Sequence, residues 1–166
     1  EHLAKLKPLL VGGGTVLNVK DTYELDNVPA RFEAGLQDYA GIIGLGEACK
    51  YLQKIGFKWI QKHEHMLNEK LTRELEKEKR IRILGPHDAK KRGSICSFIV
   101  DNADPLAIAR LLSSQNMLVR AGMHCAHYWF NARKLNGSVR VSFSIYNTEE
   151  DVDKFMQALR EVMKIL

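Results

Sequence analysis

The stretch SICSFIVDNADPLAIARLLSSQ, residues 94–115, decides the fold class. Residues 94–100 form a short apolar run with the composition of a buried strand. Asp104 then offers a side chain that caps a helix, and Pro105 suits the first helical position. The apolar spacing that follows predicts a helix ending at about Gln115. A strand therefore passes into a helix through a short polar connection.

The pattern continues on both sides of this stretch. Further strands are predicted over residues 15–19, 81–84, 117–120 and 139–145, and an irregular connector over residues 21–31. A polar and aromatic loop is predicted over residues 121–138. Short strands separated by helices indicate an α+β (α/β-like) architecture in which helices cover a small sheet.

Three further helices follow from apolar residues at three- and four-residue spacing. The first helix begins at Asp38, and its predicted buried stripe is Ile42, Leu45, Cys49, Leu52 and Ile55. The second carries Ile60, Leu67, Leu71 and Leu75 on one face. The last begins with a capping box at Thr148 and Asp151 and is expected to bury Val152, Phe155, Met156, Leu159, Met163 and Leu166.

Composition and charge exclude some functional classes. The chain has 166 residues, of which 45% are hydrophobic and 27% charged, and its formal net charge is +5. Basic residues gather at 77–82 and 90–92 without neighbouring aromatic residues, which favours a solvated surface over a nucleic-acid site. No apolar run approaches the roughly 18 residues of a membrane span, so no membrane partner is expected.

The three cysteines, Cys49, Cys96 and Cys125, form an odd set without a close pair. This usage favours a reducing, cytoplasmic setting over a disulfide scaffold. Only Cys125 lies in a loop with an arginine and a histidine close in sequence, Arg120 and His124. A neighbouring cation favours the thiolate, which is the nucleophilic form. Cys125 is therefore the candidate reactive thiol.

Less specific interpretations of the same loop remain open at this point. Cys125 could be a packed loop residue, or it could bind zinc together with His124 and His127, with His63 or His65 completing the set. The spacing lacks the usual paired separations of zinc ligands. A cysteine-protease dyad would need an oxyanion hole and a specific base, and neither is marked in the sequence.

Five motifs carry a family resemblance. In order they are Gly12–Gly14, Arg31–Gly35, Gly41–Gly46, the loop Val119–Ala126, and Val139–Phe143 with Tyr146–Thr148. Together they resemble the group II, Suf-type cysteine desulfurases of the class V aminotransferase family, from about Leu9 to the last helix. The resemblance implies the C-terminal small domain of a fold-type I enzyme that depends on pyridoxal phosphate.

The resemblance also implies roles for individual residues. Cys125 would take sulfur from substrate L-cysteine, forming a persulfide and leaving L-alanine. Arg140 would clamp the substrate carboxylate, a task that suits a guanidinium group. Arg120 and His124 would support the loop and its charge. The sulfur would pass to an acceptor or iron–sulfur scaffold protein, and the complete enzyme would be a homodimer.

Three departures from the family pattern limit these expectations. Leu36 stands where the family commonly has a threonine whose hydroxyl reaches the cofactor phosphate of the neighbouring subunit, and His127 stands where glutamine or another residue is more usual. No lysine lies in the Ser-x-His-Lys context that holds the cofactor, and the chain begins at Glu1. We therefore expect a piece of a longer or split enzyme, inactive without a large-domain half.

The expected division places a connector in residues 1–36, following the absent cofactor-lysine domain, and the small domain in residues 37–166. Two other functions remain open. The chain could be a non-catalytic module that relays persulfide sulfur through Cys125. It could also be part of a selenocysteine lyase, since those enzymes share much of this motif set.

Overall fold

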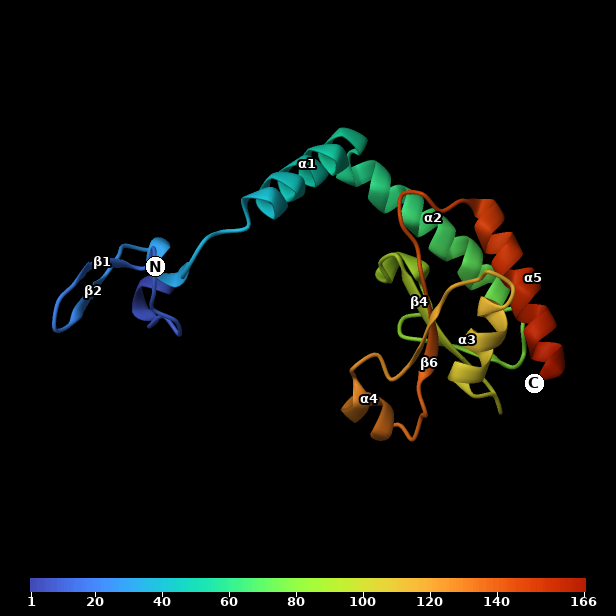
Figure 1. The fold of residues 1–166 in the computed structure, drawn as a ribbon. Helices are drawn as coiled ribbons and strands as arrows, with labels where there is room; N and C mark the ends of the chain where they lie inside the picture. Colours follow the sequence, from blue (N-terminus) through green and yellow to red (C-terminus); the bar gives the residue numbers. More distant parts are fainter. The chain divides into compact units, whose positions relative to one another are not determined.

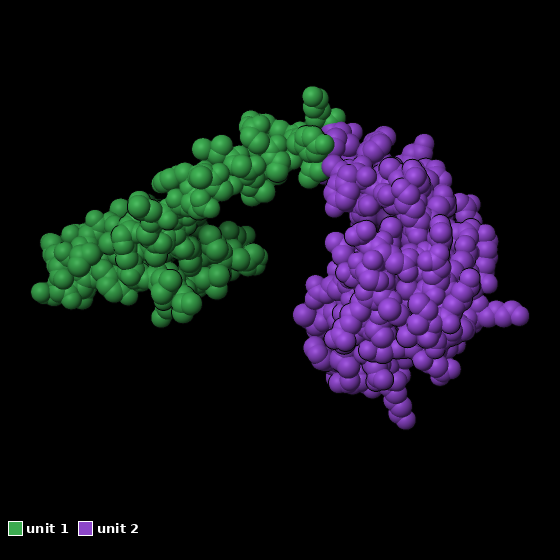
Figure 2. Space-filling view, turned by 45° about the vertical axis from the view of Figure 1, so that its right-hand side comes forward, with its two compact units in different colours: residues 1–54 green, residues 55–166 purple.

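The computed structural model describes all 166 residues and divides them into two compact units, Glu1–Lys54 and Ile55–Leu166 (Figure 2). The chain carries both strands and helices along its length, as Figure 1 shows. The predicted α+β class is therefore confirmed.

The first unit contains short elements and one long helix. The elements are η1 (Leu3–Lys5), β1 (Val16–Val19), β2 (Tyr23–Leu25), η2 (Ala30–Phe32) and α1 (Tyr39–Ile55), whose last residue lies in the second unit. β1 and β2 form an antiparallel two-stranded sheet. The only buried residue is Thr15, whose hydroxyl donates to the carbonyl of Gly12 at 2.7 Å and whose carbonyl accepts from Asp26 at 2.9 Å. Hydrogen bonds rather than apolar packing therefore organise this unit.

The second unit contains a four-stranded antiparallel sheet and the helices that cover it. Its elements are α2 (Phe57–Leu75), β3 (Ile81–Leu84), η3 (Ala89–Lys91), β4 (Ile95–Val100), α3 (Pro105–Ser113), β5 (Arg120–Gly122), α4 (His127–Asn131), β6 (Ser138–Ser142) and α5 (Glu149–Ile165). The strand order is β3-β4-β6-β5. β4 and β6 therefore occupy the centre, and β5 lies at one edge.

Alternation along the central strands gives the sheet two different faces. Cys96, Phe98 and Val100 of β4 and Val139 and Val141 of β6 are buried. They pack in one hydrophobic core with apolar residues of α2, α3 and α5. The intervening residues of both strands point to the opposite face, which these helices do not cover. This open face is where the polar side chains of β6 lie.

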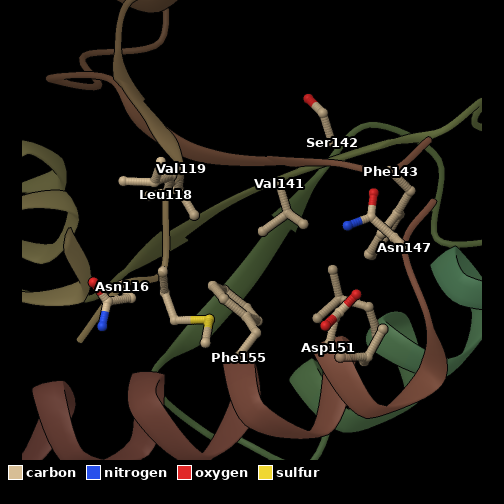
Figure 3. A pocket seen from close by; sticks show the side chains of 12 residues that line it. Asn116, Leu118, Val119, Val141, Ser142, Phe143, Asn147, Asp151 and Phe155 are labelled. Atoms are coloured by element: carbon tan, nitrogen blue, oxygen red, sulfur yellow. The ribbon is translucent and has the colours of Figure 1, made fainter.

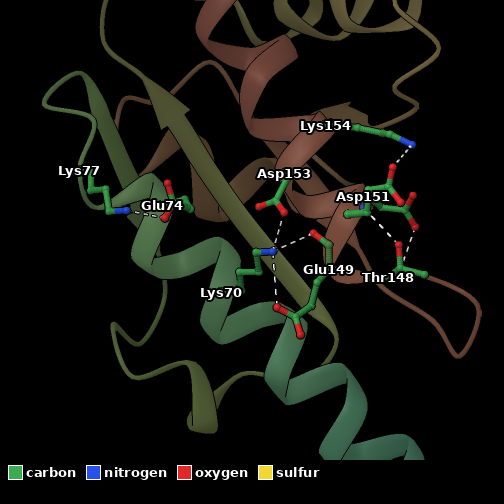
Figure 4. Close-up of polar contacts among 9 residues, drawn as sticks. Lys70, Glu74, Lys77, Thr148, Glu149, Asp151, Asp153 and Lys154 are labelled. Carbon is green, nitrogen blue, oxygen red and sulfur yellow. Dashed lines mark hydrogen bonds and ion pairs between the residues drawn. The ribbon is translucent and has the colours of Figure 1, made fainter.

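Polar contacts join α2 to α5 at the edge of the core (Figure 4). Lys70 of α2 pairs with Asp153 at 2.8 Å and with Glu149 at 3.4 Å. Arg160 of α5 pairs with Glu74 at 3.1 Å and with Glu78, just beyond α2, at 2.7 Å. The predicted capping box is present, since Thr148 and Asp151 bond reciprocally at the start of α5. These contacts lie at the surface and contribute modestly beside the apolar core.

A buried polar network fixes the connection between β3 and β4. Arg92 is buried, and its guanidinium donates to the carbonyl of Pro86 at 2.7 Å and to the hydroxyl of Thr72. Asn68 of α2 donates to the carbonyls of Gly93 and Ile95 at 2.6 and 3.2 Å. The buried guanidinium of Arg92 therefore binds neutral oxygen acceptors. These hydrogen bonds connect the loop between β3 and β4 to α2.

Several predicted boundaries were wrong. The stretch predicted as an irregular connector contains β2, because that segment pairs with β1. The strand predicted at 117–120 begins only at Arg120, where its pairing with β6 starts, and β6 ends at Ser142 rather than at residue 145. The predicted loop 121–138 contains the short helix α4. The prediction that Leu166 is buried at the end of α5 was also wrong. Leu166 is 41% exposed, and Val162 is the buried residue of the last turns.

The prediction that Cys49 lies on a buried stripe was also wrong. No residue of α1 is buried, and Cys49 is exposed. The apolar spacing is present in the helix, but the first unit contains no second layer that covers it. Cys96, in contrast, is fully buried in the sheet, as its apolar strand predicted.

None of the helices combines the length and apolar character needed to cross a bilayer.

The division between the compact units falls between Lys54 and Ile55. The next residue, Gly56, has a φ of +92° and lies between α1 and α2. The expected boundary after residue 36 stays a prediction.

Candidate active site

Two arginines lie side by side on the open face of the sheet. The ladder between β5 and β6 places Arg120 directly opposite Arg140, and Ser97 of β4 lies opposite Arg140 on its other side. Residues directly opposite in an antiparallel pair project to the same face and lie within about 5.5 Å at Cβ. Two adjacent guanidinium groups repel each other unless an anion lies between them. The Nε atom of Arg140 is also buried without a partner, so the pair is suited to bind a carboxylate.

Close backbone approach holds the two strands together at the start of the loop. A Cβ atom on Gly137 would lie 2.8 Å from the backbone carbon of Gly122, so only glycine fits this position. Both glycines also adopt positive φ angles, which other residues rarely tolerate. The loop that carries Cys125 therefore begins and ends at two glycines whose backbones are in close contact.

Cys125 lies at the tip of a tight turn. His124 and Cys125 both have left-handed backbone conformations, with φ of 51° and 62°, and Ala126 donates to the carbonyl of Met123 at 2.7 Å. The thiol is exposed, and its Sγ lies 4.0 Å from Nη2 of Arg120. Non-glycine residues in this conformation are uncommon and cluster at functional sites. The turn presents the thiol to solvent beside a permanent cation.

His124 is held by Ser138 at the first residue of β6. Its Nε2 lies 2.9 Å from the hydroxyl oxygen and 3.2 Å from the carbonyl oxygen of Ser138. Because a carbonyl oxygen only accepts, Nε2 carries the proton, and the buried Nδ1 has a free lone pair without a partner. Burial and the charges of Arg140 and Arg120 lower the pKa of His124 below its ordinary 6.5. At pH 7 this imidazole is therefore neutral, and the cation beside the thiol is Arg120.

The other two cysteines have different surroundings. Burial raises the pKa of the Cys96 thiol to about 11, so it stays protonated and unreactive at neutral pH. Cys49 is exposed on α1, with no arginine bonded to its sulfur. Cys125 is thus the only cysteine that combines exposure with a guanidinium neighbour.

The structure brings together all four residues that the sequence singled out, Cys125, Arg140, Arg120 and His124, on β5, β6 and the loop between them. Sequence reasoning missed Ser138, which is fully buried and orients His124. The available signal was its position two residues before Arg140, but the strand was predicted to begin only at residue 139, whereas β6 begins at Ser138. No group of three metal-ligating side chains lies close enough to hold an ion.

A separate pocket of about 320 Å³ lies on the covered side of the sheet (Figure 3). Val141 and Phe143 line it, together with Phe155 of α5 and Met117. Because Arg140 alternates with Val141, its side chain points to the opposite face. This pocket is therefore distinct from the site around Cys125.

Comparisons with known proteins match the whole chain. Residues 1–155 match the family described as aminotransferase class-V. The chain is 39% identical to the protein named "Probable cysteine desulfurase" from Pyrococcus abyssi, a match that covers 100% of this chain and 41% of that protein. A match to a protein of the same name from Methanothermobacter thermautotrophicus is 38% identical and covers 95% of this chain and 40% of the relative. The chain thus spans about two fifths of the curated relatives it matches.

Solved structures agree in fold. The chain superposes on the apo cysteine desulfurase of Thermococcus onnurineus NA1 with a TM-score of 0.93 at 36% identity, over 99% of this chain and 41% of that one. The Escherichia coli cysteine desulfurase CsdA, in its S-sulfonic acid form, gives a TM-score of 0.91 at 27% identity, over 99% of this chain and 40% of that one. The predicted match to part of a fold-type I enzyme is confirmed, and the chain belongs to the class-V aminotransferase family.

Proposed function

We propose that this chain is the sulfur-accepting part of a cysteine desulfurase, the enzyme that converts L-cysteine to L-alanine. One observation carries the proposal: the exposed Cys125 thiol lies 4.0 Å from Arg120, and Arg120 lies opposite Arg140. This arrangement places a nucleophile beside a pair of cations suited to an amino-acid carboxylate. The names of the relatives point to the same reaction.

Each residue has a distinct task in the proposed reaction. Arg140 and Arg120 hold the substrate carboxylate on the open face, and Arg120 also stabilises the thiolate of Cys125. The thiolate attacks the substrate sulfur, so a new S–S bond forms and the carbon–sulfur bond breaks. The electron pair stays on the substrate carbon, which takes up a proton and leaves as alanine. Ser138 and the neutral His124 hold the loop in place during this exchange.

The residues of this chain do not by themselves fit the cofactor, pyridoxal phosphate. Leu36 is 96% exposed and offers no hydrogen-bonding group for a phosphate, and no lysine lies in the context that holds the cofactor. When bound, the cofactor supplies an electron sink. We therefore assign it to the large-domain part of the complete enzyme, with residues 1–36 as the connector and residues 37–166 as the small domain.

Four further features belong to the proposal. The Suf-type subgroup is favoured by the motif Arg120–Ala126. The complete enzyme would be a homodimer that passes persulfide sulfur to an acceptor or iron–sulfur scaffold protein. The three free cysteines favour a reducing, cytoplasmic setting.

An assay of products tests the proposal. The chain is incubated with pyridoxal phosphate and L-cysteine, alone and with a candidate large-domain partner, and sulfide and alanine are measured. We expect turnover only with the partner, and its loss in Cys125→Ser. The matched control is Cys49→Ser, which removes the other exposed thiol and should retain full turnover. Retained activity in Cys125→Ser would contradict the role of this thiol.

A second candidate function rests on the exposed Cys125 thiol beside Arg120 alone. A persulfide-relay module would accept sulfur on Cys125 from another protein and pass it on without producing alanine. Incubation with a persulfide donor distinguishes the two functions. A relay module should form a persulfide on Cys125 without the large-domain partner, and it should produce no alanine when that partner is present. Replacing L-cysteine with L-selenocysteine in the product assay separates the selenocysteine lyase alternative.

A further inference from the structure

The net charge of the chain comes from one segment. Between Pro105 and Thr148 there is no Asp or Glu, and the five basic residues there equal the whole formal charge of +5. They are Arg110, Arg120, Arg133, Lys134 and Arg140. Elsewhere acidic and basic residues balance. The segment contains the Cys125 loop, and Arg120 lies 4.0 Å from the Cys125 thiol. From outside the segment, Asp101 and Asp104 line a pocket together with Lys134.

Helix α4 adds exposed aromatic side chains beside that thiol. It begins two residues after Cys125, and Figure 1 shows it at the edge of the second unit away from α2 and α5. Tyr128 is 88% exposed and Trp129 is 37% exposed. The guanidinium carbon of Arg133 lies 4.2 Å from the centre of the Trp129 ring and forms no ion pair. We call Cys125, Tyr128, Trp129, Arg133 and Lys134 the α4 surface.

The substrate does not account for this surface. An amino acid as small as cysteine is served by the arginine pair and the thiol. Tyrosine, tryptophan and arginine are instead the residue types that dominate binding energy at protein interfaces. Arg133 and Arg82 line one pocket that no carboxylate lines, so this part of the surface favours a partner with negative charge at the contact.

We propose that the α4 surface is the docking surface for a sulfur-accepting protein that presents its thiol beside Asp or Glu residues. This inference rests on the proposed function, since it assumes that Cys125 carries the transferable sulfur. The acceptor thiolate attacks the outer sulfur of the Cys125 persulfide. One S–S bond forms, the bond to Sγ breaks, and Cys125 leaves as a thiolate. No external oxidant or reductant is needed.

The test measures thiol–disulfide exchange and therefore needs no desulfurase activity. The 166-residue chain carries Cys49→Ser, so that Cys125 is the only exposed thiol. Two peptides of equal length each carry one cysteine activated as a thionitrobenzoate disulfide, flanked by glutamates in one and by lysines in the other. We expect the acidic peptide to react at least about tenfold faster in low salt, with the ratio falling as salt screens the charges.

Variants separate the α4 surface from general charge. Arg133→Gln with Lys134→Gln should lower the acidic-peptide rate several-fold, and Tyr128→Ala should lower it further. The matched control is Arg110→Gln, which removes a charge of the same segment from α3 and should have little effect. Alkylation by neutral iodoacetamide should be unchanged in all of these variants, which shows that the thiol itself is intact.

Three results would overturn the proposal. Equal rates for the two peptides would show that the surface has no charge preference. If Arg110→Gln lowered the acidic-peptide rate as much as Arg133→Gln with Lys134→Gln, the preference would come from net charge and not from the α4 surface. An exchange rate that falls with chain concentration would assign the surface to a second copy of this chain. A failure of the alanine assay, with the peptide preference intact, would instead count against the desulfurase function alone.

Discussion

The two compact units differ most in how much apolar surface they bury. Residues 1–54 contain many apolar side chains, yet only Thr15 is buried there. Residues 55–166 contain the whole hydrophobic core, built on β4, β6 and three helices. A two-stranded sheet and a single helix have no second layer to cover an apolar face, and each is marginal alone. Apolar content therefore stabilises a fold only where the topology brings two layers together.

The largest expected effect comes from opening the core of the second unit. Phe98 is fully buried and packs edge-on against Phe155, with ring centres 6.4 Å apart. Phe98→Ala should lower the free energy of unfolding by about 3–5 kcal/mol, because a cavity replaces the ring. Urea unfolding measures this change. The matched change in the first unit is Leu45→Ala, which should lower the free energy of unfolding by less than about 0.5 kcal/mol. A large effect of Leu45→Ala would remove the contrast between the units.

A smaller effect is expected from the buried arginine network. Arg92→Ala leaves the acceptors of Thr72 and Pro86 without their donor, and should cost about 2–3 kcal/mol of unfolding free energy. The matched control is Arg31→Ala in the first unit, where the guanidinium donates to one carbonyl, of Asp26, at 2.8 Å. Calorimetry of both variants compares them. Equal losses would show that the first unit relies on its polar contacts as much as the second does.

Alkaline pH should weaken the second unit through Cys96. Its folded pKa is raised to about 11 from 9.0, so the unfolded thiol ionises first as pH rises. The contribution of the protonated Cys96 thiol to the free energy of unfolding is complete below about pH 9 and is lost between pH 9 and 11. The free energy of unfolding should therefore be lower by about 1 kcal/mol at pH 10. The measurement is the free energy of unfolding from pH 8 to 10.5. Cys96→Ala should reduce this pH dependence, and an unchanged dependence would contradict the assignment.

The smallest effect is expected from removing the first unit. A chain of residues 55–166 keeps the whole core and should unfold cooperatively, with a free energy within about 1 kcal/mol of the full chain. Denaturant unfolding followed by tryptophan fluorescence suits this comparison, since Trp59 and Trp129 both remain. Loss of the cooperative transition would show that the second unit depends on residues 1–54.

Much of the second unit was predictable from local patterns. Asp104 and Pro105 start α3, the Thr148 capping box starts α5, and the apolar run around Cys96 forms a central strand. Each depends on neighbours in sequence, which a pattern captures. The start of β5 was missed, because a three-residue edge strand exists only through its pairing with β6.

The candidate site shows the same division. The sequence identified Cys125, Arg140, Arg120 and His124, because their types and order match a family motif. It did not identify Ser138 as the partner of His124, and it placed Cys49 in a core that this chain does not form. Hydrogen bonds across 14 residues and the covering of a helix face both depend on distant segments.

The sequence by itself determined the α+β class, the family and the candidate nucleophile. These follow from periodicity, capping and motif order, which are local properties of the chain. Only the tertiary structure decided that Arg120 and Arg140 lie opposite each other and that burial beside them lowers the pKa of His124. It also decided that no residue of α1 is buried in this chain. Strand register, burial and electrostatic surroundings are set by contacts between distant segments, and these form only when the chain folds.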